Sequence, residues 1–173
     1  MRKIILNLAM SLDGYIVDEK GGYEWIEGDG DKSLNTAETH NFPKFIESID
    51  IVVMGSKSYE DIGIEDYPDK KIIVATSREM ENYDNVEFVN NDIVGYVQAL
   101  QKEDGKDIWL FGGSGLTDNF MKEDVVDEFH VGMVPIILGG GRPLFFSDRP
   151  TVKLHLDKYT IEEGLPLLVY SRR

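Results

Sequence analysis

Residues 107–120 read DIWLFGGSGLTDNF, an apolar run followed at once by two glycines and a segment that can continue as a helix. The apolar residues 108–111 show no alternation, which is typical of a strand buried on both faces in a parallel α/β sheet. Gly112 and Gly113 permit backbone angles closed to other residues and place no Cβ between the main chain and a ligand. The N–H groups that begin the helix favour an anion, most often phosphate. The stretch therefore predicts strand, glycine turn and helix, with tight packing and phosphate binding as its two possible roles.

The length and composition of the chain limit the number of domains, the kinds of site and the classes of partner that it can have. At 173 residues the chain fits one domain, large enough to bury about 70% of its unfolded surface. It has no cysteine, which excludes disulfides, thiolate catalysis and cysteine-based zinc sites. Its three histidines (His40, His130 and His155) are too widely spaced to suggest a metal site, so no metal is expected. The formal charge of −14 disfavours nucleic acid and anionic membranes as partners, although a small phosphate ligand remains compatible with a locally basic cleft.

The N-terminus faintly resembles a signal peptide, with Met1-Arg2-Lys3 before an apolar run. Asn7 interrupts that run and no small-residue cleavage site follows, so we interpret it as a first strand. No stretch approaches 18 apolar residues, the length needed to span a membrane. We therefore expect a cytoplasmic protein.

The remaining pattern predicts one α/β domain over residues 1–173. Residues 18–32 are acidic and glycine-rich, which indicates a mobile loop. Pro135 lies inside a long apolar run and implies a bend, a bulge or a sheet edge there. The expected strands are residues 3–10, 51–54, 71–75, 86–89, 108–111 and 128–138; the expected helices are 44–48 and 93–102; and 152–159 with 165–170 form a closing antiparallel hairpin.

Three of the predicted strands end in glycine, hydroxyl or basic residues. Residues 55–58 read GSKS, 76–78 read TSR and 112–115 read GGSG. Each end alone is also compatible with a solvated turn. In a parallel sheet, however, ligands bind at the carboxyl ends of the strands, and three such ends can converge on one crevice. Their convergence favours a ligand site.

Several motifs then carry a family resemblance: SLDGYI, EWI, VVMGSKSYE, IIVATSR, LFGGSGL and VPIILGGGRPLF, in this order. Over residues 3 to about 170 the chain resembles the dihydrofolate-reductase-like fold, most of all the reductase domain of the riboflavin-biosynthesis deaminase-reductase and its free-standing relatives. The resemblance implies an NADPH-dependent reductase, usually a homodimer. It also implies a three-layer fold with a central mixed, mostly parallel sheet, and a cofactor lying against Gly112 and Gly113, often with a cis peptide bond between them.

The strand ends and the resemblance together imply a set of site residues. Asp13 and Trp25 match positions that face the nicotinamide and the substrate; Asp13 is the candidate for a proton-relay role, with a structural role in its turn as the alternative. Ser56 stands where the family usually has arginine, so we expect a reduced preference for NADPH over NADH. The implied cofactor contacts are Gly55, Lys57, Ser58, Thr76, Ser77, Arg78, Gly112, Gly113, Ser114, Gly115 and Leu116.

The implied activity is hydride transfer to a small heterocyclic or ribosyl substrate, as in 5-amino-6-(5-phosphoribosylamino)uracil reductase. True dihydrofolate reductases carry a carboxylate on the helix after the tryptophan, whereas Asp29 and Asp31 lie outside such a helical context. Dihydrofolate reduction is therefore an alternative, as is a non-catalytic nucleotide-binding or sensor protein. The apolar run PLFF at residues 143–146 predicts a surface that a homodimer covers.

Overall fold

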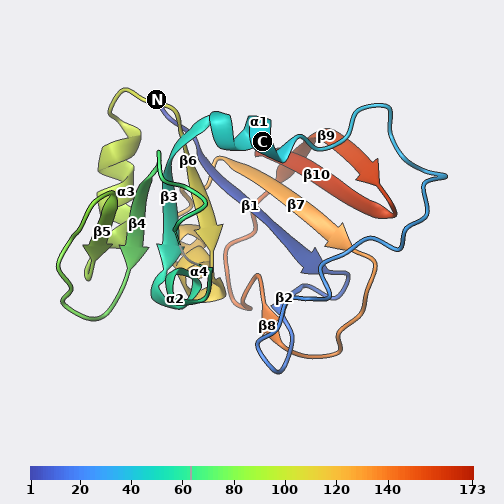
Figure 1. Cartoon of the computed structure of the whole chain (residues 1–173), viewed down its shortest axis with the longest axis horizontal. Helices are drawn as coiled ribbons and strands as arrows, with labels where there is room; N and C mark the ends of the chain where they lie inside the picture. Colours follow the sequence, from blue (N-terminus) through green and yellow to red (C-terminus); the bar gives the residue numbers. More distant parts are fainter. Residues whose placement is uncertain (63) are drawn as a thin grey trace.

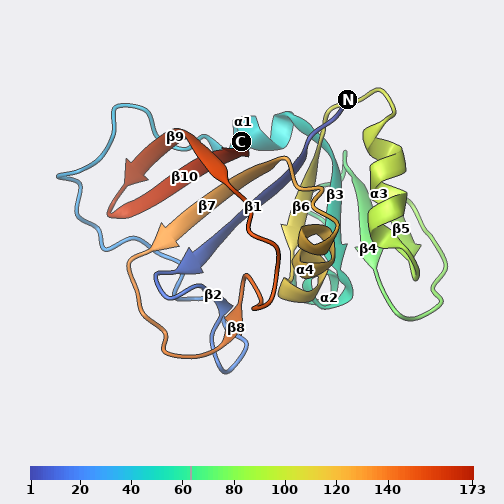
Figure 2. The ribbon, with the colours of Figure 1, turned by 180° about the vertical axis from the view of Figure 1, so that it is seen from behind.

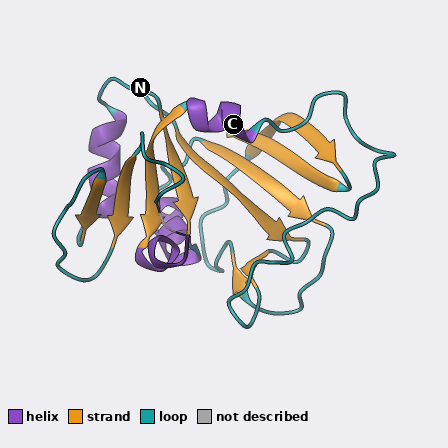
Figure 3. Cartoon of the chain, viewed as in Figure 1, coloured by secondary structure: helices purple, strands orange, loops and turns teal. Residues whose placement is uncertain are grey.

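A computed structural model describes residues 1–62 and 64–173. One eight-stranded sheet in the order β5-β4-β3-β6-β1-β7-β10-β9 forms its centre (Figures 1 and 3). Its strands are β1 (Ile4–Ser11), β3 (Ile49–Gly55), β4 (Lys71–Ala75), β5 (Val86–Val89), β6 (Asp107–Gly112), β7 (Glu128–Val134), β9 (Leu154–Glu162) and β10 (Leu165–Arg172). A small second sheet pairs β2 (Tyr15–Val17) with β8 (Arg142–Pro143), and the helices are α1 (Phe42–Glu47), α2 (Ser56–Ile62), α3 (Ile93–Gln101) and α4 (Ser114–Lys122).

The strands from β5 to β7 run parallel, and the register places Leu6 beside both Leu110 of β6 and Phe129 of β7. β10 pairs antiparallel with both β7 and β9, so β9 and β10 close the sheet as a hairpin. The mixed, mostly parallel sheet and the C-terminal hairpin are thus confirmed. The parallel strands are nearly continuous in apolar residues because both of their faces are covered.

Successive residues of each strand face opposite sides of the sheet, so the chain forms three layers. On one side Leu6 belongs to a core cluster with Val97 of α3 and Phe120 of α4. On the other side Ile5 belongs to a cluster with Phe45 of α1. Figures 1 and 2, seen from opposite directions, show α1 and α2 over one face and α3 and α4 over the other.

The strand expected through residues 128–138 is shorter than the sequence pattern suggested. It ends at Val134, immediately before Pro135. Proline has no N–H to donate to a sheet ladder, and the chain turns there, with the N–H of Ile136 bonded to the carbonyl of Val134 at 2.8 Å. Beyond the turn the carbonyl of Ile136 accepts the N–H of Leu12 at 2.9 Å, and the chain then leads into the glycine-rich segment.

The first helix begins slightly earlier than expected. It covers Phe42–Glu47, and the side-chain oxygen of Asn41 accepts the N–H of Lys44 at 2.9 Å. Pro43 lies in the first turn, where its missing N–H costs nothing. The cap and the proline therefore mark the start of α1.

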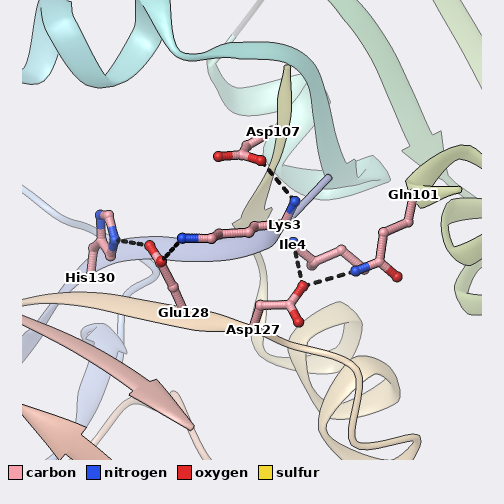
Figure 4. A network of polar contacts seen from close by, with 7 residues as sticks. All are labelled: Lys3, Ile4, Gln101, Asp107, Asp127, Glu128 and His130. Carbon is pink, nitrogen blue, oxygen red and sulfur yellow. Dashed lines mark hydrogen bonds and ion pairs between the residues drawn. The ribbon is translucent and has the colours of Figure 1, made fainter. Parts of the chain in front are cut away.

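Polar contacts fasten the amino ends of the central strands (Figure 4). The carboxylate of Asp127 accepts the N–H of Ile4 at 2.8 Å and the side-chain amide of Gln101 at 2.9 Å. The ammonium of Lys3 pairs with Glu128 at 2.5 Å. These contacts lie at the end of the sheet opposite to the carboxyl ends, and they stabilise the strand register there.

No helix in the described ranges combines the length and the apolar character needed to cross a membrane.

Candidate functional site

A cleft of about 860 Å³, the main cleft, opens where β3, β4, β5 and β6 end. It lies at the carboxyl ends of parallel strands, the edge where ligands bind in open α/β sheets. Most of the predicted cofactor residues line it together: Gly55, Lys57, Ser58, Thr76, Ser77, Gly113, Ser114, Gly115 and Leu116. The fold thus brings residues from three distant segments to one cavity.

The glycine turn after β6 has the backbone that the sequence indicated. Gly112 has φ +109° and Gly113 has φ +92°, both in the region that favours glycine. A Cβ on Gly112 would meet the Leu8 side chain at 3.4 Å, so Gly112 also allows close packing behind the cleft. The peptide bonds of the described residues are all trans, so the cis bond implied between the two glycines is absent.

The start of α4 offers polar groups to the main cleft. Gly113 is its N-cap and supplies no side-chain capping bond, so N–H groups of the first turn remain for a ligand. Ser114 is 1% exposed, and its hydroxyl has no hydrogen-bond partner among the described residues. A Cβ on Gly115 would meet nothing within 4 Å, so the space in front of this turn is open. This combination fits a phosphate group.

Two cations line the main cleft without a carboxylate partner in the described part of the chain, Lys57 and Arg142. Lys122 lines it as well, but its ammonium pairs with Asp118 at 2.8 Å. The sequence interpretation missed Arg142. The sequence pattern that could have indicated Arg142 is the GGGR segment after β7, which was interpreted only as part of the motif VPIILGGGRPLF.

Arg78, predicted as a cofactor contact, does not line the main cleft. Its guanidinium pairs with Glu60 of α2 at 2.6 Å, and both side chains are more than half exposed. The backbone N–H of Arg78 donates to the hydroxyl of Thr76 at 3.1 Å, so this bond stabilises the turn that residues 76–78 form after β4. Lys57 is therefore the better placed of the two predicted cations.

Asp13 lies outside the main cleft and is engaged with backbone. Its carboxylate accepts the hydroxyl of Ser11 at 2.7 Å and the N–H groups of Leu138 at 3.1 Å and Gly139 at 2.8 Å. The Ser11 hydroxyl contributes most to lowering the pKa of Asp13, and the two N–H groups act in the same direction. This geometry supports the structural alternative for Asp13.

Trp25 also lies outside the main cleft, in the segment between β2 and α1. Its indole N–H donates to the carbonyl of Gly22 at 3.1 Å, so the ring is tied to its own loop. The structure does not bring Trp25 together with the other predicted site residues.

An apolar cavity of about 160 Å³, the inner recess, adjoins the main cleft. Both cavities share Lys57, Ser58, Gly113 and Arg142 as lining residues. Its apolar walls include Leu8, Ala9, Ile16 and Phe111. A ligand with phosphates in the main cleft can therefore extend an aromatic ring into a mostly apolar space beside β1.

A third cavity of about 430 Å³, the aromatic recess, continues past Leu8, Ala9 and Phe111. Phe42, Tyr67 and Trp109 line it, and Asn7 contributes a buried side-chain amide whose nitrogen has no partner among the described residues. His40 lies at the same cavity, where burial lowers its pKa and the His130 ring acts in the same direction. Sequence reasoning missed this cavity because its residues come from unrelated segments of the chain.

The comparisons with known proteins agree with this geometry. The family model of the RibD C-terminal domain matches residues 52–166. The uncharacterised proteins YwjB and YyaP of Bacillus subtilis are 35% and 32% identical to the chain; the first match covers 90% of the chain and 89% of the relative, the second 98% and 94%.

Among solved structures, a Shewanella sp. PV-4 protein with a provisional assignment to riboflavin biosynthesis superposes with a TM-score of 0.83 at 27% identity, covering 100% of this chain and 99% of that one. The Thermotoga maritima deaminase/5-amino-6-(5-phosphoribosylamino)uracil reductase gives 0.70 at 19% identity, covering 99% of this chain and 57% of that one. The second likeness concerns the fold alone. On this evidence the chain belongs to the RibD C-terminal domain family and has its dihydrofolate-reductase-like fold.

Proposed function

We propose that the protein is an NADPH-dependent reductase of a small heterocyclic or ribosyl substrate. One observation carries the proposal: a cleft with a glycine turn, a helix start, a buried hydroxyl and two cations opens directly into an apolar recess. Within residues 1–62 and 64–173, neither that hydroxyl nor either cation has a partner. Membership of a reductase-type family supports it. Such a cleft suits a ligand that has phosphates at one end and a flat ring at the other.

The residues of this chain would bind the cofactor and orient its ring. The first turn of α4 and the hydroxyl of Ser114 would hold the oxygens of the pyrophosphate, and Arg142 would balance their charge. Lys57 would contact the additional phosphate that distinguishes NADPH from NADH. The inner recess would hold a ring against Leu8 and Phe111 and keep water away from it. A bound NADPH supplies the hydride, so the contribution of the protein is alignment and exclusion of solvent.

The aromatic recess supports a planar substrate. Phe42, Tyr67 and Trp109 offer ring faces and edges, and the amide nitrogen of Asn7 offers a buried donor to a ring carbonyl or nitrogen. A substrate resembling 5-amino-6-(5-phosphoribosylamino)uracil, the compound named for the Thermotoga maritima relative, presents such acceptors. The chain spans 57% of that bifunctional protein, so the likeness extends to a part of it.

Dihydrofolate is a weaker candidate. The carboxylate of Asp29 accepts the N–H of Asp31 at 2.8 Å within an exposed turn. Neither residue lines the inner recess or the aromatic recess. The carboxylate that supports pterin protonation in true dihydrofolate reductases therefore has no counterpart at these two positions.

Two measurements test the proposal. Binding of NADPH is measured by calorimetry, and its oxidation is followed by absorbance with a panel of pyrimidine and pterin acceptors. We expect binding together with turnover of a ribosylated pyrimidine. Binding without turnover across the panel would favour the nucleotide sensor, and absence of NADPH binding would overturn the reductase.

A further inference from the structure

Arg142 differs from most arginines of this protein in having no carboxylate partner in the described residues. The chain carries 32 acidic against 18 basic residues, so a guanidinium usually finds a carboxylate. Among the residues that the structure describes, only Arg142 and the C-terminal Arg173 do not. The paired arginines are Arg2 with Asp50, Arg78 with Glu60, Arg149 with Asp118 and Arg172 with Asp124. An unpaired guanidinium on a cleft wall is available to a bound anion.

The position of Arg142 depends on the small β2–β8 sheet. Arg142 pairs with Val17 across this sheet and lines both the main cleft and the inner recess. The preceding Gly141 has φ +133°, and a Cβ there would lie 2.1 Å from the carbonyl oxygen of Val17. Only glycine allows this close approach, which places Arg142 on the same cavity as Gly113 and Ser114.

The segment that carries Arg142, residues 138–144 or the glycine loop, is tied at both ends to the turn after β1. At its start, the carboxylate of Asp13 accepts the N–H groups of Leu138 and Gly139. At its end, the N–H of Leu144 donates to the carbonyl of Gly14 at 2.9 Å. Asp13 therefore holds the loop from which Arg142 reaches the cleft, although it does not line that cleft itself.

We infer that Arg142 binds the phosphate groups held at the start of α4, and that Asp13 is the positioning residue that holds Arg142 through the glycine loop. The inference rests on the proposed function for the identity of the ligand. The start of α4 lies beside Gly113, which lines both the main cleft and the inner recess. Phosphates bound there are next to the recess for the ring, so they are the pyrophosphate that NADPH and NADH share. Arg142 thus contributes equally to both cofactors, and Asp13 contributes through Arg142.

The first experiment measures dissociation constants of NADPH, NADH and inorganic pyrophosphate by calorimetry for wild type and Arg142→Gln. A lost charge-assisted contact should weaken all three by roughly 10- to 150-fold. Arg173→Gln is the matched control and should change none of them, because it removes the same charge from an arginine that likewise has no carboxylate partner in the described residues and lies outside the main cleft. Equal affinities in wild type and Arg142→Gln, or a loss confined to NADPH, would overturn the role of Arg142.

The second experiment is a double-mutant cycle of Asp13→Ala with Arg142→Gln. If Asp13 acts through Arg142, Asp13→Ala weakens pyrophosphate binding in the wild-type background and adds little in the Arg142→Gln background. Asp13→Asn, which keeps one acceptor oxygen for the loop, should restore part of the affinity. Additive losses would contradict positioning, as would a fall in kcat with unchanged cofactor affinity, the result that a proton relay predicts.

The two hypotheses fail differently. If pyrophosphate binds in a way that depends on Arg142 but NADPH does not bind, the anion site is supported and NADPH is excluded as the cofactor. NADPH affinity that is the same in wild type and Arg142→Gln would leave the proposed reductase intact and would contradict the role of Arg142. Absence of binding to NADPH and to pyrophosphate would overturn both.

Discussion

The carboxylate of Asp13 accepts an N–H bond of 2.8 Å from Gly139, a residue 126 positions further along the chain. This bond joins the turn after β1 to the glycine loop. The Ser11 hydroxyl, the strongest influence, and the loop N–H groups lower the pKa of Asp13, so the carboxylate remains ionised at neutral pH and holds no proton to deliver. An acidic residue in a reductase motif can therefore serve geometry instead of proton transfer.

Gly115→Val should abolish NADPH binding in a folded protein. The new side chain meets no protein atom within 4 Å of its Cβ, so it extends into the main cleft where a phosphate would lie. Valine in place of glycine also does not weaken the helix. We expect an affinity loss of 100-fold or more, on the order of 3 kcal/mol, measured by calorimetry beside a thermal melt. Gly113→Val would be less informative, because φ +92° there strains any other residue.

Lys57→Ala should lower the preference for NADPH over NADH more than Arg78→Ala does. Lys57 lines the main cleft beside Thr76 and Ser77, whereas Arg78 is engaged with Glu60 outside it. One charge-assisted contact to the additional phosphate is worth roughly 1.5 to 3 kcal/mol, about 10- to 150-fold in the ratio of affinities. Titration of both variants with both cofactors measures this ratio. A larger effect of Arg78→Ala would place the adenosine phosphate at the turn after β4 instead.

Asn7→Leu should stabilise the protein and impair turnover. The amide nitrogen of Asn7 is buried without a partner among the described residues, a state that costs about 1 to 3 kcal/mol. Leucine has the same branched shape and removes that cost, but it also removes the donor from the aromatic recess. We expect a higher melting temperature and a raised KM for the acceptor with unchanged NADPH affinity. An unchanged KM would exclude Asn7 from substrate binding.

Acid should weaken the fold partly through Asp118. The hydrogen bond from Arg149, followed by that from Lys122, lowers the pKa of Asp118 to about 2. A folded pKa below the unfolded value of about 3.9 means that the contribution is complete above about pH 5 and is lost as the pH falls toward 2. Urea unfolding of wild type and Asp118→Asn should therefore converge at low pH. Asp148→Asn, which removes a neighbouring exposed carboxylate, should leave the difference between pH 5 and pH 2 intact.

Phe145→Asp should shift the expected homodimer toward monomer. Phe145 and Phe146 are 45% and 37% exposed beside an apolar cavity of about 350 Å³ that Met121 and Leu154 also line. Placing a charge in a buried contact between two copies would be unfavourable. Light scattering at micromolar concentration measures the change against a Leu12→Asp control, which alters an exposed side chain outside this cavity. A wild-type monomer would end the dimer hypothesis.

The sequence alone determined most of the strands and helices and nine of the residues that line the main cleft. The strand, glycine turn and helix at residues 107–120 follow from local properties: apolar continuity, the backbone freedom of Gly112 and Gly113, and helix-compatible residues after them. The strand at residues 86–89 was likewise predictable because its causes are neighbours in sequence. Parallel strand ends meet at one edge, so the convergence of three motifs was predictable without coordinates.

Only the tertiary structure decided which charges remain for a ligand. From the sequence, Arg78 was predicted to contact the cofactor, but the fold pairs it with Glu60. Arg142 was interpreted only as part of a loop, but the β2–β8 sheet brings it to the main cleft. The donor of Asn7 was hidden in the same way, because its neighbours Phe42, Tyr67 and Trp109 come from three distant segments. The strength and availability of a polar group depend on the partner and the burial that long-range contacts provide, and a linear pattern contains neither.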